Sequence, residues 1–160
     1  MSFVIMGVSG CGKSSLGIYL SESLNLPFHD GDDYHPKTNV DKMAGGNPLN
    51  DQDRKPWLEI LGGVLSENVI VACSALKMSY RDILRTFATT KITFIYLKGS
   101  YDYYLKRMES RDAHYMKSGM LKSQFDALEE PPIDGEENVI VVDVKGKSVV
   151  EIGECLKAEM

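Results

Sequence analysis

The chain has 160 residues, of which 43% are apolar, enough for one domain with a hydrophobic core. Its formal net charge of −5 argues against general binding to nucleic acid or to an anionic membrane. The three cysteines, Cys11, Cys73 and Cys155, form no C-x-x-C pair, which argues against a disulfide framework or a zinc ribbon and favours a reducing cytosol.

The start of the chain and its hydropathy argue against two further kinds of segment, a signal peptide and a membrane-spanning helix. Residues 1–8 enter an apolar run with no basic lead-in, which predicts a first strand and not a signal peptide. No apolar run reaches the roughly 18 residues that a membrane-spanning helix needs. We therefore expect a cytoplasmic protein without a membrane partner.

Short apolar runs alternate with helical patterns along the chain. In chain order the predicted elements are a strand at 3–8, a helix at 13–24, a weaker strand at 27–32, a short helix at 37–44, a helix at 57–65, a strand at 69–75, a helix capped by Ser79, a strand at 93–99, a helix capped by Ser100, a strand at 139–144 and a last helix at 148–160. Nearly continuous β-branched strands are typical of a parallel sheet covered on both faces. The pattern predicts an α/β fold with a doubly wound parallel five-stranded sheet, and no linker divides residues 1–160 into separate domains.

The motif GVSGCGKS, residues 7–14, matches the phosphate-binding pattern G-x-x-x-x-G-K-[ST] in full. It lies between a predicted strand and a predicted helix, as the pattern requires. Its glycines allow backbone N–H groups to converge on phosphate oxygens at the positive end of a helix. We expect Lys13 to contact the β- and γ-phosphates of a nucleotide and the Ser14 hydroxyl to bind Mg²⁺. A glycine-rich turn without a ligand is the alternative.

A P-loop identifies a nucleotide site but not a reaction. The chain contains no N/T-K-x-D signature of GTPases and no L-S-G-G-Q-type signature of ABC ATPases, and the strand at 69–75 ends without a carboxylate. The nearest acids are Asp30, Asp32 and Asp33, at the carboxyl end of the second predicted strand. The carboxyl end of that strand opens onto the ligand-binding side of a doubly wound sheet, a position where small-molecule kinases carry an acid.

Phosphoryl transfer needs positioning, charge neutralisation and a proton acceptor. Asp32 is the candidate acceptor for a hydroxyl proton, with a turn aspartate in DGDD as the alternative. His35 is a candidate ligand for a polyol, or else a capping histidine before Pro36. His29 is expected to pack in the strand. The histidines lack a third ligand at a recognisable spacing, so a zinc site is disfavoured.

Cations elsewhere in the chain are candidates for substrate and nucleotide contacts. Arg54 lies just before a predicted helix, Lys77 at the end of a predicted strand and Arg81 in the first turn of a predicted helix. These three cations could hold an acidic substrate; the alternative is three ordinary surface cations. Arg107 and Arg111 are four residues apart on one predicted helix face. They lie just before the polar stretch 112–138, which has no strand signal and is predicted to be a mobile flap. An arginine pair there suggests a lid over ATP, or else an exposed basic helix face.

These segments together closely resemble the gluconate kinases, or gluconokinases, of the P-loop small-molecule kinase group. The resemblance extends from Met6 to Pro131. It is carried by MGVSGCGKSS, DGDDYHPKTNVDKMAGGNPLNDQDRKPWL, CSALKMSYRDILR, FIYLKG and MLKSQFDALEEP. It implies an adenylate-kinase-like sheet with strand order 2-3-1-4-5 and a mobile lid at about 107–130. The implied reaction is the phosphorylation of D-gluconate by ATP to 6-phosphogluconate, feeding the pentose phosphate route, and many members look like homodimers.

The resemblance also implies site residues. The implied ATP contacts are Gly7, Val8, Ser9, Gly10, Cys11, Gly12, Lys13, Ser14, Ser15, Arg107 and Arg111, with the segment from His114 to Lys117 in the lid. The implied gluconate contacts are Asp32, His35, Arg54, Lys77 and Arg81. Mg²⁺ would lie near Ser14 and Asp32, and the catalytic residues would be Lys13, Asp32 and Arg111.

The sequence departs from the family pattern inside the P-loop. Cys11 replaces a serine that is often found there, and Ser15 stands where threonine is common. A thiol beside a phosphate is a candidate for oxidation. Two other functions stay open at this point: a related kinase for another sugar acid or for shikimate, and a non-catalytic ATP-binding module.

Overall fold

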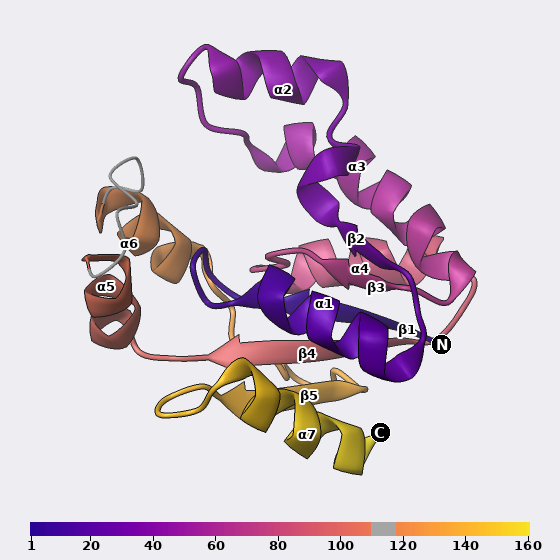
Figure 1. Cartoon of the computed structure of the whole chain (residues 1–160). Coiled ribbons are helices and arrows are strands. Elements are labelled where there is room, and N and C mark those ends of the chain that lie inside the picture. Colours follow the sequence, from indigo (N-terminus) through magenta and orange to yellow (C-terminus); the bar gives the residue numbers. More distant parts are fainter. Residues whose placement is uncertain (110–117) are drawn as a thin grey trace.

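The computed structural model of the chain describes residues 1–109 and 118–160 (Figure 1). Its centre is a five-stranded parallel sheet in the order β2-β3-β1-β4-β5. The strands are β1 (Ser2–Met6), β2 (Phe28–Asp30), β3 (Ile70–Ala72), β4 (Ile92–Lys98) and β5 (Val139–Asp143). The predicted sheet and its predicted order are both confirmed.

Helices cover both faces of the sheet (Figure 1). They are α1 (Lys13–Leu24), α2 (Lys37–Ala44), α3 (Asp51–Val64), α4 (Met78–Phe87), α5 (Tyr101–Glu109), α6 (Ser118–Ala127) and α7 (Val149–Glu159), with short 3₁₀ turns at Gly31–Tyr34 and Leu65–Glu67. Along β1, alternate residues serve two core layers. Phe3 and Ile5 pack in the layer that contains residues of α1 and α7, whereas Val4 and Met6 pack in the layer that contains residues of α3 and α4.

The ends of several elements differ from the predicted ones for local reasons. Helix α3 begins at Asp51 rather than at residue 57, because Asn50 and Asp53 form a capping box with hydrogen bonds of 2.8 and 2.9 Å. Helix α4 begins at Met78, so its N-cap is Lys77 and not Ser79. Ser100, the N-cap predicted before α5, does accept a backbone hydrogen bond, from Tyr103 N at 3.0 Å. Ser148 accepts one from Glu151 N and is the N-cap of α7.

The stretch predicted as a polar flap contains a helix, α6. Its apolar residues Leu121 and Phe125 are four apart and pack into the core, which explains the helix in a segment of polar composition. In Figure 1, α5 and α6 lie together beyond the carboxyl end of β4, while α2 stands out on the opposite side of the P-loop. Within residues 1–109 and 118–160, no helix is long and apolar enough to cross a membrane.

Candidate active site

The P-loop connects β1 to the first turn of α1. Gly10 and Gly12 have φ angles of 79° and 97°, in the left-handed region that favours glycine, and they turn the chain back toward the helix. Gly12 is the N-cap of α1, so the positive end of that helix points into the loop. Ser14 and Ser15 lie exposed in the first turn of α1. The segment therefore has the geometry of an anion-binding loop.

Lys13 folds back over the loop. Its ammonium donates hydrogen bonds to the carbonyl oxygens of Gly7 and Val8, at 3.1 and 3.0 Å. These carbonyls hold the cation beside the loop, where a nucleotide phosphate can replace them as its partner. Lys13 also contributes to the electrostatics of Asp32, where its charge lowers the pKa of that carboxyl. The ammonium thus acts on both the phosphate loop and the candidate base.

Cys11 is buried, with 3% of its surface exposed. Burial raises the pKa of its thiol, and the nearby charges of Lys13 and Arg107 only partly oppose that effect. The thiolate is the reactive form of cysteine, so this environment disfavours the oxidation that the sequence suggested. Cys11 packs among core residues below the loop.

Asp32 lies in the short 3₁₀ turn that follows β2. Asp30 caps this turn by accepting a hydrogen bond from the Asp32 backbone N–H at 3.0 Å, and Trp57 Nε1 donates to the Gly31 carbonyl at 2.8 Å. The Asp32 side chain is 84% exposed. The protein around it and then the Asp30 carboxylate raise its pKa, while the charges of His35 and Lys13 lower it. The net rise makes Asp32 a better proton acceptor than an ordinary aspartate.

Two neighbouring side chains hold the His35 ring, one against its face and one at its edge. Its ring stacks on Trp57 with centroids 4.1 Å apart, and its Nδ1 lies 3.3 Å from the Asn39 amide nitrogen. Nε2 lies 4.0 Å from the Asp32 carboxylate. Burial lowers the pKa of His35, Asp32 raises it and Arg54 lowers it, with a net fall. A neutral imidazole is therefore available to hydrogen-bond a hydroxyl group at neutral pH.

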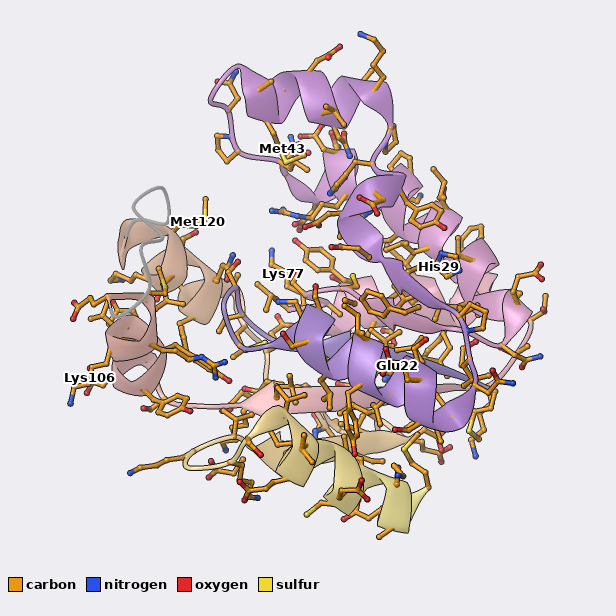
Figure 2. The ribbon with its side chains drawn as sticks, viewed as in Figure 1. Glu22, His29, Met43, Lys77, Lys106 and Met120 are labelled. Atoms are coloured by element: carbon orange, nitrogen blue, oxygen red, sulfur yellow. The ribbon has the colours of Figure 1, made fainter. Side chains whose placement is uncertain are left out.

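A second polar group joins the start of α3 to the start of α4. Lys77 Nζ donates to both oxygens of Asp51, at 3.2 and 3.3 Å, and the Tyr80 hydroxyl donates to Asp51 at 2.5 Å. Arg54 Nη1 donates to the Tyr80 hydroxyl at 3.3 Å and lies 4.0 Å from Asp51. Figure 2 shows Lys77 between the P-loop end of α1 and α3. The structure thus brings Arg54 and Lys77 together around one carboxylate.

Sequence reasoning missed Asp51 and Tyr80. Asp51 belongs to a polar run before the predicted helix, and Tyr80 is an aromatic residue near the start of α4 with no motif around it that indicates a site. Their meeting depends on the packing of α3 against α4, which no local pattern reveals. Of this group, only Arg54 and Lys77 could be predicted as site residues from the sequence.

Arg81 does not join this group, which contradicts its predicted contact with substrate. Its side chain is fully buried, and it forms a bidentate pair with Glu136 through hydrogen bonds of 2.9 and 2.8 Å. Its guanidinium also donates to the carbonyls of Ala75 and Glu129. The reason is the buried Glu136 carboxylate, which comes from the loop before β5 and draws the arginine away from the substrate side of α4.

The lid arginines are only partly placed. Arg107 Nη2 lies 3.9 Å from the point where a Cβ on Gly12 would stand, so this guanidinium reaches the P-loop. Arg111 and the segment from His114 to Lys117 lie outside the described residues. From α6, Gln124 contacts the P-loop through two hydrogen bonds to Ser9. The sequence offered one signal for it, a single amide on the face that carries Leu121 and Phe125.

Known proteins resemble this chain over most of its length. Residues 9–156 match the family model for shikimate kinase. The thermoresistant gluconokinase of Escherichia coli is 45% identical over 148 residues, which cover 89% of this chain and 83% of that protein. The thermosensitive gluconokinase of the same organism is 42% identical, over 98% of this chain and 86% of the other.

A solved structure agrees. The crystal structure of a gluconokinase from Sinorhizobium meliloti superimposes with a TM-score of 0.85 at 45% identity, covering 96% of this chain and 87% of that chain. The P-loop, the parallel sheet in the order 2-3-1-4-5 and these relatives agree with one another. The chain belongs to the gluconokinase family of P-loop kinases.

Proposed function

We propose that this protein transfers the γ-phosphoryl group of ATP to the 6-hydroxyl of D-gluconate, which gives ADP and 6-phospho-D-gluconate. The observation that carries the proposal is the identity of 42–45% to two gluconokinases. The chain also has a P-loop, an aspartate, Asp32, just after β2, and two cations, Arg54 and Lys77, around Asp51. Each part matches one end of the reaction: the P-loop the donor, Asp32 the acceptor hydroxyl, and Arg54 with Lys77 the carboxylate of an acidic sugar.

In the proposed mechanism Asp32 accepts the proton of the 6-hydroxyl as its oxygen attacks the γ-phosphorus. The raised pKa of Asp32 brings it closer to the working pH, which improves a general base. Lys13 exchanges the Gly7 and Val8 carbonyls for the phosphate oxygens and neutralises charge that develops between the β- and γ-phosphates. Arg107, with its guanidinium at the P-loop, adds charge on the same side.

The donor set at this corner fits Mg²⁺. The ion prefers hard oxygen ligands and keeps several waters, and the exposed Ser14 hydroxyl and Asp32 carboxylate are ligands of that kind. These two residues would hold it, together with phosphate oxygens of the nucleotide. When bound, the ion supplies positive charge to the β- and γ-phosphates.

The carboxylate of gluconate needs positively charged partners, and the cations beside Asp51 can supply them. Asp51 neutralises Lys77 and lies near Arg54. We propose that the carboxylate of gluconate binds these two cations and takes over part of that role. His35, neutral and stacked on Trp57, then contacts a hydroxyl along the sugar chain.

Shikimate is the second acid to test, because the matching family model bears the name shikimate kinase. Shikimate is also a carboxylate with hydroxyl groups, so the same cations could hold it. The deciding experiment couples ADP release to NADH oxidation over a panel of gluconate, shikimate and other sugar acids. We expect the highest kcat/KM with gluconate; a higher value with another acid would replace it as the substrate. ATP binding without ADP release on any acid would favour a non-catalytic module.

The remaining expectations of the family resemblance belong to the same proposal. They are a homodimer, a cytoplasmic location, a single domain with a lid at about 107–130, and a place in the pentose phosphate route. Light scattering during size-exclusion chromatography tests the first: a mass of one chain would contradict the dimer.

A further inference from the structure

Helix α6 presents one polar side chain on an otherwise apolar face. Leu121, Phe125 and Leu128 pack into the core at helical spacing, and Gln124 lies on the same face. The Gln124 carboxamide makes two hydrogen bonds with one residue of the P-loop. Ser9 N donates to its Oε1 at 2.6 Å, and its Nε2 donates to Ser9 Oγ at 2.7 Å. Two bonds to one residue fix the orientation of the loop as well as its position.

Ser9 directly follows the two carbonyls that hold Lys13. Those carbonyls belong to Gly7 and Val8. A shift of Ser9 therefore moves the carbonyl oxygens that accept hydrogen bonds from the Lys13 ammonium. Gln124 is therefore placed to set the position of the phosphate-binding cation through Ser9, from which it lies 115 residues away in sequence.

The other end of α6 is fixed to the acceptor side of the site. Just beyond the helix, Glu129 N donates to the Leu76 carbonyl at 2.8 Å, and its carboxylate accepts from Met78 N at 2.8 Å. Leu76 and Met78 flank Lys77, the cation proposed to hold the carboxylate of the substrate. One short segment thus contacts the donor loop through Gln124 and the acceptor loop through Glu129.

We propose that α6 is a brace that sets the distance between the phosphate donor and its acceptor, with Gln124 and Glu129 as positioning residues. The inference rests on the proposed function. Transfer needs reacting atoms about 3–3.5 Å apart, and a misplacement of about 1 Å can lower the rate by about 10²-fold. Loss of the brace should therefore lower kcat. Binding of the nucleotide and of the acid should change little, because the residues that contact each of them remain in place.

The test compares Gln124→Leu with the wild type in steady-state kinetics and nucleotide binding. We expect kcat to fall about 10- to 100-fold, while KM for gluconate and Kd for ADP change less than about 3-fold. Lys122→Leu, on an exposed part of α6, is the matched control and keeps wild-type kcat. Ser9→Ala combined with Gln124→Leu is expected to lose no more than Gln124→Leu alone, because both changes break the same contact.

Two results would overturn the brace. One is an unchanged kcat in Gln124→Leu; the other is a loss of ADP binding as large as the loss of kcat, which would make Gln124 part of the nucleotide site alone. If Gln124→Leu does not fold, Gln124→Asn keeps the amide, shortens its reach and carries the same expectation. Wild-type turnover of gluconate is measured first, so a failure of the proposed function is seen separately from a failure of the brace.

Discussion

Replacing Glu136 by glutamine tests the assignment of Arg81 to the core. The Glu136 carboxylate is fully buried and accepts hydrogen bonds from Arg81, from Arg85 at 2.6 Å and from Ile133 N at 3.0 Å. Burial alone would raise the pKa of Glu136, but the two arginines lower it from 4.5 to about 2. The glutamine keeps the shape of the side chain and removes its charge.

The expected magnitude follows from linkage between ionisation and folding. A pKa of about 2 in the folded state, against 4.5 when unfolded, corresponds to about 3 kcal/mol of stability. Because the folded pKa is depressed, this stability is present above pH 4.5 and is lost as the pH falls toward 2. Breaking one partner of a buried pair costs about 3–5 kcal/mol, which is the same order. We therefore expect Glu136→Gln to lower the free energy of unfolding by about 3 kcal/mol at pH 7.

Urea unfolding followed by the fluorescence of Trp57, the single tryptophan, measures this change. The difference between Glu136→Gln and the wild type should be largest at pH 7 and should narrow below pH 4.5. Glu137→Gln, at an exposed neighbouring position, is the control and should unfold like the wild type. Equal stability of Glu136→Gln and the wild type at pH 7 would refute the account of the buried pair. So would a rise in KM for gluconate in Arg81→Lys that occurs without any loss of stability.

Three further predictions concern the site. Asp32→Asn should lower kcat by about 10²–10⁴-fold while ADP still binds, and a near-normal kcat would remove Asp32 as the base. Because the pKa of Asp32 is raised, the acid limb of the kcat/KM profile should have its midpoint above the ordinary aspartate value of about 3.9; a midpoint at or below that value would contradict the assignment. Lys77→Met should raise KM for gluconate by about 10-fold, the loss of one charge-assisted contact, with KM for ATP unchanged. The exposed Lys55→Met is its control, and an equal effect at both lysines would count against a carboxylate contact.

The sequence was most informative where function depends on adjacent residues. The P-loop and the strand that precedes it follow from one motif, because backbone N–H groups of consecutive residues form the anion site. The order of the strands came from the family resemblance and agrees with the structure. Asp32 could be placed beside the loop because parallel strands bring their carboxyl ends to one edge of the sheet.

Contacts between distant elements were beyond the reach of sequence patterns. Arg81 and Lys77 were both predicted to hold an acidic substrate, yet Arg81 pairs with a buried carboxylate 55 residues away, whereas Lys77 pairs with Asp51. Gln124 gave almost no signal, because its partner Ser9 lies in the first strand-to-helix connection. The packing of α3 against α4 and of α6 against the P-loop decides which polar groups meet.

The most direct test of the central claim is phosphorus NMR of the product made from ATP and D-gluconate by the purified protein. The proposed reaction predicts one new phosphate monoester whose phosphorus couples to the two protons on C6, formed together with an equal amount of ADP. Phosphate on another carbon would contradict the placement of the 6-hydroxyl at Asp32. ATP and gluconate that remain unreacted, in a sample that turns over a different acid, would contradict the function itself.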